Sequence, residues 1–351
     1  MASYRKKGLS LSAEMAKNGL RAPVNVTWEI TLKCNMRCVH CLSNSGDGSK
    51  NELNTKECMK LIDDLTTLKV FQVNIGGGEP FIREDFLDLL DYSHKKGLVT
   101  CVSTNGVALD NSVAKWLSAM NMLYLQVSLD GADEETNDRI RGRGTFKKVL
   151  NAIEALTANK VKFSINTVLT RTNFGQLETL RTMAGEYGAE LRVSRFRPSG
   201  RGKSSRADLG PTPEQLEYLA EWLEKHDLVR TGDSFFCLTS DHRRQKGLDM
   251  CGAAKMTCCV SPQGNVYPCA FLQEAPFLSG NVREKAFKEI WDTSPILEQF
   301  RNINVKSCVD CYRFEVCRGG CPAMAYHTYH DINMPDPECL VNLKTGTKSA
   351  A

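Results

Sequence analysis

The chain has 351 residues, of which 42% are hydrophobic and 25% charged, and its mean hydropathy is −0.32. This composition is typical of a soluble globular protein that exceeds one ordinary domain. The formal charge of +4 is too small to indicate binding to nucleic acid or to a membrane surface, and no apolar run approaches the roughly 20 residues that span a bilayer. We therefore expect no nucleic acid and no membrane among its partners.

From residue 24 to about residue 200, apolar segments alternate with amphipathic helical patterns. The expected strands are 24–30, 70–75, 99–103, 123–129, 161–169 and 190–196. The expected helices, with apolar residues three and four positions apart, are 55–68, 84–96, 112–120, 146–160 and 175–188. Six βα units in succession predict a parallel sheet. Six rather than eight units favour a partial (β/α)6 barrel of the TIM type, open on one side, with a doubly wound open sheet as the alternative.

Polar or glycine-rich loops follow the first four expected strands. They are Cys34–Cys41, Gly76–Pro80, Ser103–Gly106 and Ser128–Gly131. In parallel α/β architectures the loops after the strands share one edge, where ligands bind and catalysis takes place. The four loops therefore predict one site rather than scattered turns.

The first of these loops carries three cysteines, Cys34, Cys38 and Cys41, in the spacing C-x3-C-x2-C. Cysteine thiolate is the usual ligand of a cubane iron–sulfur cluster. Three protein ligands leave one of four irons open to another molecule, which indicates a cluster that performs chemistry. Half of a zinc site is the alternative, because zinc also takes four thiolates.

A second cysteine array follows a Gly/Ser/Pro/Arg-rich stretch after Pro198 and a helical pattern in 214–227. It comprises Cys251, Cys269, Cys308, Cys311, Cys317, Cys321 and Cys339, with Cys258 or Cys259 as an eighth member. Eight thiolates suit two four-ligand sites. The turn 262–265 predicts a hairpin that brings the strand of Cys258 and Cys259 beside Cys269. Two structural zinc sites in a binding or scaffold protein remain the alternative.

Four other residues near these arrays receive a different interpretation. Cys58 and Cys101 fall within a helix and a strand, where we expect buried core thiols. Cys237 lies outside both arrays and is not assigned, and His40 in the first loop is expected to pack rather than to bind metal. Because no export signal is found in residues 1–23, fifteen cysteines are expected to be reduced, as in a cytoplasmic protein.

The first cysteine loop, the Gly77-Gly78-Glu79-Pro80 run and the βα repeats resemble the radical S-adenosylmethionine (SAM) enzymes. The second array resembles a SPASM domain, which holds two auxiliary [4Fe–4S] clusters. The resemblance extends over residues 24–340 and implies the following organisation: an N-terminal arm (1–23), a radical SAM core (24–200), a linker (201–240), a SPASM domain (241–345) and a disordered tail (346–351).

The resemblance also implies roles for individual residues. The cofactors would be SAM and three [4Fe–4S] clusters. Cys34, Cys38 and Cys41 would hold the cluster that binds SAM. SAM itself would contact Gly77, Gly78, Glu79, Asn105, Ser128 and Arg141. Auxiliary cluster I would use Cys251, Cys258, Cys269 and Cys321, with Cys259 the alternative to Cys258, and auxiliary cluster II would use Cys308, Cys311, Cys317 and Cys339.

Within this family, the strings VNIGGGEPF, VSLDGA, RFRPSGRG and CRGGC are most similar to those of mycofactocin maturases. That likeness implies oxidative decarboxylation of a C-terminal Tyr in a ribosomally made precursor peptide, followed by a carbon–carbon bond to the preceding Val, through a 5′-deoxyadenosyl radical. Ala270 replaces the catalytic aspartate of sulfatase maturases, which argues against that activity. Other thioether or carbon–carbon crosslinks and tetrapyrrole side-chain decarboxylation are the alternatives.

The resemblance implies protein partners as well. Only about 23 residues precede the first expected strand, so we expect a separate small protein to recognise the short precursor peptide. An electron donor such as flavodoxin or ferredoxin is also expected. Three arginines, Arg195, Arg197 and Arg201, are interpreted either as ligands of a peptide carboxylate or as solvated loop charges.

Overall fold

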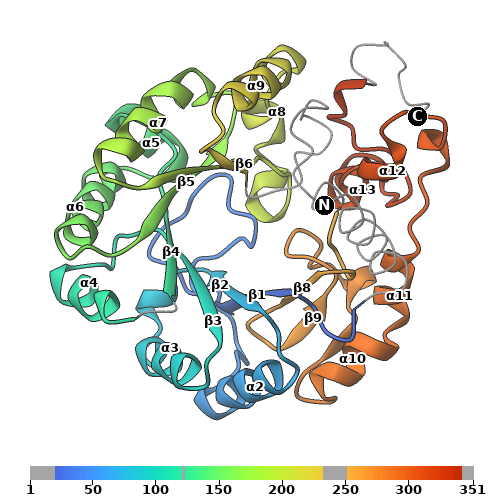
Figure 1. The fold of residues 1–351 in the computed structure, drawn as a ribbon, viewed down its shortest axis with the longest axis horizontal. Coiled ribbons are helices and arrows are strands. Elements are labelled where there is room, and N and C mark those ends of the chain that lie inside the picture. Colours follow the sequence, from blue (N-terminus) through green and yellow to red (C-terminus); the bar gives the residue numbers. More distant parts are fainter. Residues whose placement is uncertain (1–19, 121–122, 232–250, 342–351) are drawn as a thin grey trace, which may run out of the picture.

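The computed structural model describes residues 20–120, 123–231 and 251–341. In these residues a single curved sheet is lined on its outer side by helices (Figure 1). The strands are β1 (Asn25–Thr31), β2 (Gln72–Gly77), β3 (Val99–Thr104), β4 (Leu123–Ser128), β5 (Phe163–Leu169), β6 (Glu190–Arg195), β7 (Arg230–Thr231), β8 (Thr257–Val260), β9 (Asn265–Tyr267) and β10 (Gly280–Asn281). Cys237, most of the expected arm and the tail lie outside the described residues.

The helices follow the strands in βα order through the first two thirds of the chain. They are α2 (Thr55–Thr67), α3 (Phe86–Lys95), α4 (Asn111–Ser118), α5 (Glu134–Arg141), α6 (Thr145–Ala158), α7 (Leu177–Glu186), α8 (Arg206–Leu209), α9 (Pro213–Lys225), α10 (Phe287–Thr293), α11 (Pro295–Arg301), α12 (Phe314–Cys317) and α13 (Pro322–Tyr329). Among the described helices, none combines the length and apolar character needed to cross a membrane.

The strand order decides between the two expected architectures. The sheet runs β10-β9-β8-β1-β2-β3-β4-β5-β6-β7, and β1 to β6 are parallel neighbours in chain order. A doubly wound sheet would reverse its strand order at a switch point. The partial (β/α)6 barrel is therefore confirmed, and all six expected strands form within two residues of their expected bounds.

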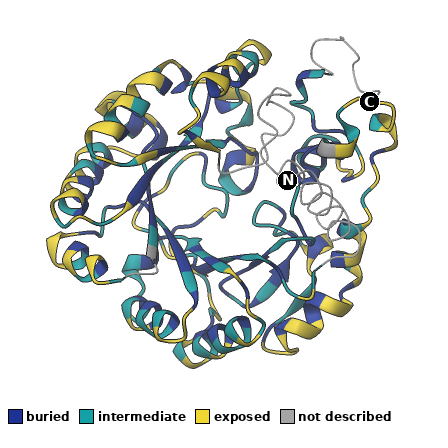
Figure 2. Ribbon diagram, viewed as in Figure 1, coloured by how far each residue is buried: buried dark blue, intermediate teal, exposed yellow. Residues whose placement is uncertain are grey.

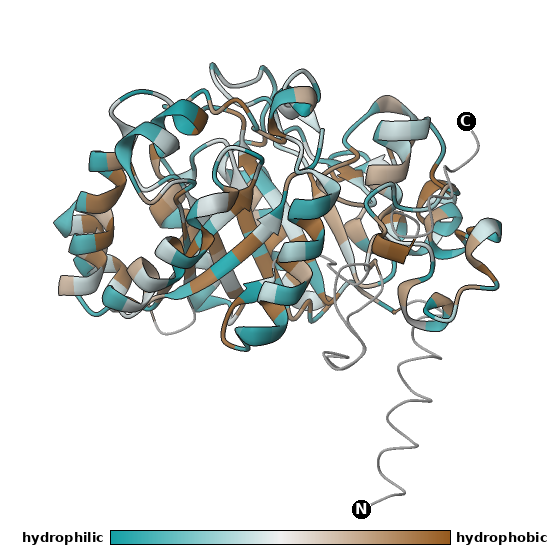
Figure 3. Cartoon of the chain, turned by 90° about the horizontal axis from the view of Figure 1, so that it is seen from above, coloured by the Kyte–Doolittle hydropathy of each residue, from teal (hydrophilic) through white to brown (hydrophobic). Residues whose placement is uncertain are grey.

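The core lies between the sheet and its helices. Val26, Trp28 and Ile30 alternate along β1 and are buried, and the helix that follows in the chain, α2, buries Leu61 and Leu65. Figure 2 shows buried positions on the faces where helices meet the sheet and exposed ones on the outer helix faces. Figure 3 shows the same division as hydrophobic colour inside and hydrophilic colour outside. The apolar face that each helix owes to its 3.6-residue period thus packs on the sheet. This packing holds in place the edge of the sheet that carries the loops.

The cysteine-rich region continues the barrel sheet instead of standing apart from it. β8 pairs in parallel with β1, so that Val26 lies opposite Cys258 and Thr27 opposite Cys259. The expected hairpin is present, because β8 and β9 are antiparallel with Val260 opposite Val266. Cys258 and Cys259 therefore lie directly beside β1, the strand that leads into the first cysteine loop.

One helix of the barrel core escaped the sequence prediction. α5 has no apolar stripe, because six of its eight residues, EETNDRIR, are charged or amide side chains and only one is aliphatic. Its local signals are nevertheless clear: Asp133 caps its first turn by accepting the Thr136 N–H, Glu134 and Glu135 follow, and Gly142 ends the helix at φ 113°. α5 matters because it carries Arg141.

Candidate metal centres

The first cysteine loop folds back on the end of β1. The Cys34 N–H donates to Gly46 O at 2.7 Å, and the Gly46 N–H donates to Leu32 O at 2.8 Å. Burial and the neighbouring thiols raise the pKa of Cys38 to about 11, although the Arg141 charge acts to lower it. Burial also raises the pKa of Cys34, and the Cys41 thiol adds to the rise at both Cys34 and Cys38, as expected of thiols that lie near one another in one loop.

Polar side chains from the next two strand ends support this loop. The Asn105 side chain donates to Asn35 Oδ1 at 2.7 Å, and its Nδ2 lies 3.8 Å from Cys34 Sγ. The Glu79 carboxylate accepts from the N–H groups of Phe81 and Asn105 and from the Thr104 hydroxyl, at 2.7–3.1 Å. Burial raises the pKa of Glu79 to about 7 against these hydrogen bonds. Glu79 thus joins the loop after β2 to the loop after β3.

The glycines of the second loop pack against the backbone that enters the cysteine loop. The Gly78 N–H donates to Thr31 O at 2.7 Å and the Glu79 N–H to Lys33 O at 2.9 Å. A Cβ on Gly78 would stand 2.0 Å from Lys33 O. Glycine is therefore needed at this position because two chain segments approach each other so closely.

A buried ion cluster holds the cysteine loop from its other side. Asp130, which follows β4, pairs with His40 Nε2 at 2.9 Å and with Arg141 Nε at 2.7 Å, and it accepts the Val168 N–H at 2.7 Å. Asp130 is fully buried. His40 packs as expected from the sequence, but the role of Asp130 was missed. The only sequence signal was its place directly after a strand, in Ser128–Gly131.

The expected SAM contacts gather on this edge. Gly77 ends β2 and is followed by Gly78 and Glu79. Asn105 follows β3, Ser128 ends β4, and Arg141 ends α5. The Arg141 backbone oxygen lies 3.8 Å from Cys38 Sγ. Ser128 is half-buried. The structure therefore brings all six to the strand ends around the cysteine loop, and their contact with SAM stays a prediction.

Three thiols of the second array form a first auxiliary group, Cys251, Cys269 and Cys321. Burial, together with the Cys321 thiol, raises the pKa of Cys251 to about 11, and Cys251 and Cys321 in turn raise the pKa of Cys269. These residues come from the start of the region, from the end of the β8–β9 hairpin and from the turn before α13. The sequence prediction of a shared site is consistent with this grouping.

The two candidates for its fourth member point to opposite faces of β8. Adjacent residues of a strand alternate between the faces. Cys259 lies opposite Tyr267 in the β8–β9 hairpin. Cys269 follows Tyr267 by two residues in the chain. Burial, Glu29 and the thiols of Cys258 and Cys269 raise the pKa of Cys259, whereas burial raises that of Cys258 against Arg301 of α11. The alternation of faces supports Cys259, and the choice between the two cysteines stays a prediction.

The remaining four thiols form a second auxiliary group. Burial and the thiols of Cys339 and Cys311 raise the pKa of Cys308, and burial with Cys339, Asp336 and Cys308 raises that of Cys317 to about 12. The Cys311 N–H donates to Cys308 O at 3.0 Å, which folds these two thiols into one turn. These influences are consistent with one site, and the assignment of all four residues to it stays a prediction.

Thiolates can hold either a zinc ion or an iron–sulfur cluster. Zinc holds its sulfur ligands at about 2.3 Å. Within residues 20–120, 123–231 and 251–341, no three His, Cys, Asp or Glu side chains come together tightly enough to hold one ion. Thiolate is the usual ligand of a cubane iron–sulfur cluster, so the chemistry of the donor sets fits the expected clusters. Cys58 and Cys101 are buried core thiols, as expected.

Of the three arginines at and after the end of β6, Arg195 and Arg197 are buried and Arg201 is half-buried, so they are not the solvated loop charges of one sequence interpretation. Arg195 is 1% exposed in its side chain and pairs with Asp336 at 2.8 Å and Glu338 at 3.2 Å. Arg201 donates to Cys38 O at 2.9 Å and Ser45 O at 3.0 Å.

The third of these arginines, Arg197, is 5% exposed and stacks on Phe271, 4.3 Å from its ring centroid. Two of the three arginines therefore brace loops of the metal centres, and Arg197 lies beside an auxiliary group.

Comparison with known proteins places both regions in families. Residues 28–183 match the model of the radical SAM superfamily, and residues 251–322 match SPASM, an iron–sulfur cluster-binding domain. The mycofactocin maturase MftC of Mycolicibacterium smegmatis is 43% identical, over 93% of this chain and 85% of that protein. This chain belongs to the mycofactocin maturase family of radical SAM proteins.

Other relatives are more distant. The AdoMet-dependent heme synthase of Methanosarcina barkeri is 30% identical over 91% of this chain and 97% of that protein. Among solved structures, Streptococcus suis SuiB bound to precursor peptide SuiA matches with a TM-score of 0.76 at 19% identity, covering 96% of this chain and 80% of that one. This structural likeness confirms the fold of a radical SAM core followed by a SPASM region.

Proposed function

We propose that this radical SAM maturase oxidatively decarboxylates the C-terminal Tyr of a short precursor peptide and then joins the residue to the preceding Val by a carbon–carbon bond. The observation that carries the proposal is the 43% identity to MftC across 93% of the chain. The geometry adds support, because both cysteine arrays fold into separate thiol groups on a barrel edge.

The proposed cofactors are SAM and three [4Fe–4S] clusters. Cys34, Cys38 and Cys41 would hold the cluster with an open iron. Auxiliary cluster I would take Cys251, Cys269, Cys321 and, on the geometry of β8, Cys259 rather than Cys258. Auxiliary cluster II would take Cys308, Cys311, Cys317 and Cys339. When bound, SAM and the first cluster supply a carbon-centred radical that removes a hydrogen atom from the peptide.

The residues around the first loop would orient these groups and exclude water. Glu79 and Asn105 connect the loops after β2 and β3. Asp130 connects His40 of the cysteine loop to Arg141 of α5. Such pre-positioned polar groups keep a reactive centre within the tolerance that radical transfer needs. Gly77, Gly78, Glu79, Asn105, Ser128 and Arg141 are the residues that we propose for SAM.

Partners complete the proposal. A separate small protein would present the precursor peptide, and a flavodoxin or ferredoxin would supply electrons. SuiB, which shares this fold, was solved in complex with a precursor peptide, SuiA, and this complex supports a peptide substrate here. The need for reduced thiols supports work in the cytoplasm.

The test is an anaerobic reaction of reconstituted protein with SAM, a reductant, a Val-Tyr-terminated precursor peptide and its recognition protein, followed by mass spectrometry. The expected product has lost CO2 and two hydrogens, with deoxyadenosine formed alongside. A matched peptide ending in Val-Phe controls for the tyrosine hydroxyl. Deoxyadenosine without any change in the peptide would contradict the proposed substrate.

A second experiment tests the role of the first loop. Changing Cys34, Cys38 and Cys41 together to Ala should abolish deoxyadenosine formation while the auxiliary iron remains. The matched control changes the core thiols Cys58 and Cys101 to Ala, which should leave the iron content unaltered. Retained SAM cleavage in the triple variant would overturn the assignment of this loop.

A further inference from the structure

The barrel strands carry polar side chains on their inner face, which is the face turned away from the helices. On β1, Val26, Trp28 and Ile30 pack in the core, so the residues between them lie on the inner face, because successive residues of a strand alternate. The polar residues of this face include Asn25, Thr27 and Glu29 on β1, Gln72 and Asn74 on β2, and Gln126 and Ser128 on β4. Closed TIM barrels fill the same space with bulky branched side chains. The inner face of this barrel is therefore suited to a polar occupant.

Glu29 is a buried carboxyl on the inner face. It lies opposite Gly76 of β2 and is 2% exposed. Gln273, from the loop after Cys269, donates a hydrogen bond to its carboxyl group. Glu29 Oε2, in contrast, meets no hydrogen-bond partner among residues 20–120, 123–231 and 251–341. Because buried oxygens of this kind normally have a partner, Oε2 marks a position where a ligand can bind.

Gly76 leaves room beside this carboxyl. Its φ lies outside the left-handed region. Among the described residues, chain neighbours aside, an added Cβ would come within 4 Å of the Ser103 Cβ alone, at 3.7 Å, which is ordinary contact. Gly77 differs, since a Cβ there would stand 2.5 Å from Thr31 O. Neither backbone conformation nor packing requires glycine at position 76, and the missing side chain leaves the inner face open next to Glu29.

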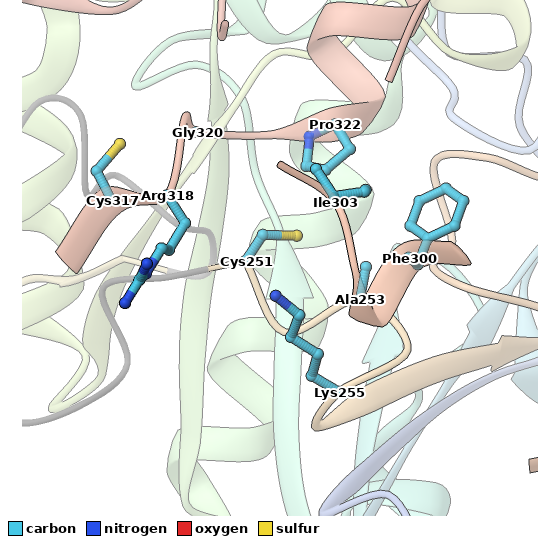
Figure 4. A pocket seen from close by; sticks show the side chains of 9 residues that line it. All are labelled: Cys251, Ala253, Lys255, Phe300, Ile303, Cys317, Arg318, Gly320 and Pro322. Carbon is cyan, nitrogen blue, oxygen red and sulfur yellow. The ribbon is translucent and has the colours of Figure 1, made fainter. Parts of the chain in front are cut away.

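A different hollow lies in the auxiliary region. Figure 4 shows a pocket lined by Cys251 and Cys317, with Lys255 extending toward Cys251. Because thiols of both auxiliary groups line this pocket, it belongs to the metal centres described above. Neither Glu29 nor Gly76 lines it. The open position on the inner face is therefore separate from the pocket between the auxiliary groups.

The expected position of SAM limits what can reach Glu29. Gly77 is expected to contact SAM, and an added Cβ on Gly77 would stand 3.0 Å from the Glu29 Cβ. A substrate side chain on Gly76 would thus lie beside the proposed source of the radical. Of the two peptide residues to be joined, tyrosine has a ring that can lie on a glycine backbone and a hydroxyl that can donate to a carboxyl oxygen. Valine has neither.

We propose that Glu29 is a specificity-determining residue: the phenol O–H of the C-terminal Tyr donates to Glu29 Oε2 while the ring lies on Gly76. This inference rests on the proposed function, because it presupposes a tyrosine-terminated peptide. A phenylalanine ring would fit the same place but leave Oε2 without a partner. Sites built to hydrogen-bond a hydroxyl reject the analogue that lacks it, so Glu29 selects tyrosine over phenylalanine.

The test measures binding separately from turnover. Reconstituted protein with SAM but no reductant is titrated with labelled peptides that end in Val-Tyr or Val-Phe, with the recognition protein at one saturating concentration. The wild type should bind the Val-Tyr peptide about tenfold more tightly, as expected for one hydrogen bond to a buried group. The two peptides are otherwise identical, so the ratio of their Kd values reports the phenol alone.

Variants of Glu29 assign this preference to its carboxyl. Glu29→Leu should abolish the preference for tyrosine, whereas Glu29→Gln, which keeps an oxygen acceptor, should retain most of it. The matched control is Glu154→Leu, the same change at an exposed position of α6, which should keep the wild-type ratio. A general loss of structure would weaken both peptides together and leave the ratio unchanged. The same ratio in Glu29→Leu as in the wild type, or no preference in the wild type, would overturn the proposal.

Gly76→Val carries the test if Glu29→Leu does not assemble iron. Valine suits a strand, and its side chain would occupy the place of the tyrosine ring. Binding of the Val-Tyr peptide should weaken and the preference for tyrosine should be lost, while the Kd of SAM stays unchanged. The control is Gly175→Val, at an exposed position where no described residue lies within 4 Å of an added Cβ. A wild-type preference in Gly76→Val would overturn the proposal.

Failure of this inference and failure of the proposed function give different results. A peptide that is decarboxylated in the mass-spectrometric reaction, but is bound without preference for tyrosine, would leave the function standing and overturn the role of Glu29. A peptide that is neither processed nor bound would overturn both.

Discussion

Asp130 links the cysteine loop to the barrel through a few buried charges. Its carboxylate bridges His40 and Arg141, which approach from the cysteine loop and from α5. Burial alone would raise the pKa of Asp130, but Arg141 and His40 hold it below its usual range. The charge on Asp130 is therefore part of the folded structure at neutral pH.

Removing that charge should be costly. Asp130→Asn leaves the buried Arg141 without its carboxylate partner, and breaking a buried ion pair in this way costs about 3–5 kcal/mol. We expect a lower melting temperature of the apoprotein and less iron bound by the first loop. Asp133→Asn is the matched control, because Asn caps a helix as well as Asp does. Equal melting temperatures of the two variants would contradict this account.

Glu29 is a second buried carboxyl, on β1 next to the auxiliary region. It is 2% exposed, and its Oε2 has no hydrogen-bond partner in the described part of the chain. Burial raises its pKa from 4.5 to about 7, against a hydrogen bond from Gln273. The folded protein thus keeps a proton that the unfolded chain releases above pH 4.5. The resulting stability is full below pH 4.5 and is lost as the pH rises to about 7.

The pH dependence of stability should therefore change in Glu29→Gln. A difference of 2.5 pKa units, from 4.5 to about 7, corresponds to at most about 3 kcal/mol. We expect the melting temperature of the wild type to fall between pH 5 and pH 8, and the variant to fall less. Glu154→Gln, an exposed change on α6, should keep the wild-type slope. A slope in Glu29→Gln as steep as in the wild type would refute the assigned protonation.

At the scale of elements, the end of β2 and the cysteine loop depend on backbone contact. Gly77 has φ 108°, and a Cβ there would stand 2.5 Å from Thr31 O. The N–H groups of Gly78 and Glu79 then complete hydrogen bonds to the segment that follows β1. Two loops far apart in sequence thus fit together because side chains are absent between them.

Gly78→Ala tests this fit. Its Cβ would press on the Lys33 carbonyl at 2.0 Å, where backbone must move. Overpacking of this kind costs about 1–3 kcal/mol. We expect reduced iron in the first loop and slower deoxyadenosine formation. Gly175→Ala is the control, since nothing lies within 4 Å of its added Cβ. Normal SAM cleavage by Gly78→Ala would show that the contact is not needed.

At the scale of the whole molecule, the barrel and the auxiliary region form one unit. β8 pairs with β1, and Arg195 at the end of β6 pairs with Asp336 and Glu338, close to Cys339. Asp336 also accepts the Cys321 N–H at 3.1 Å. The last strand of the barrel core is thus tied to residues beside both auxiliary groups.

Arg195→Ala should loosen both auxiliary groups together. It removes the ion pairs of Arg195 with the buried Asp336 and the half-buried Glu338, and breaking a buried ion pair costs about 3–5 kcal/mol. We expect a lower melting temperature and loss of auxiliary iron, measured after anaerobic reconstitution, while the first loop still binds iron. Arg181→Ala on the surface of α7 should cost less than about 1 kcal/mol. Full auxiliary iron in Arg195→Ala would contradict the proposed tie.

The sequence by itself predicted the barrel and the family, both of which are confirmed, and it divided the cysteines into three expected groups. These features are local: strand and helix periods appear in short windows, and C-x3-C-x2-C brings three thiols together within one loop. The polar loops after the strands were also readable, because parallel strands end at one edge. Among the described helices of the barrel core, α5 escaped, since it lacks an apolar stripe and is defined by its caps.

The tertiary structure decided what each side chain faces. The choice between Cys258 and Cys259 depends on the register of β8 against β1 and β9, which neither spacing nor composition contains. Arg195 and Arg197 are buried, and Arg201 is held by the Cys38 carbonyl, because segments distant in sequence pack against them. Long-range packing alone brings Asp130 to His40 and Arg197 to Phe271. The charges that surround the metal centres were therefore decided only when the chain folded.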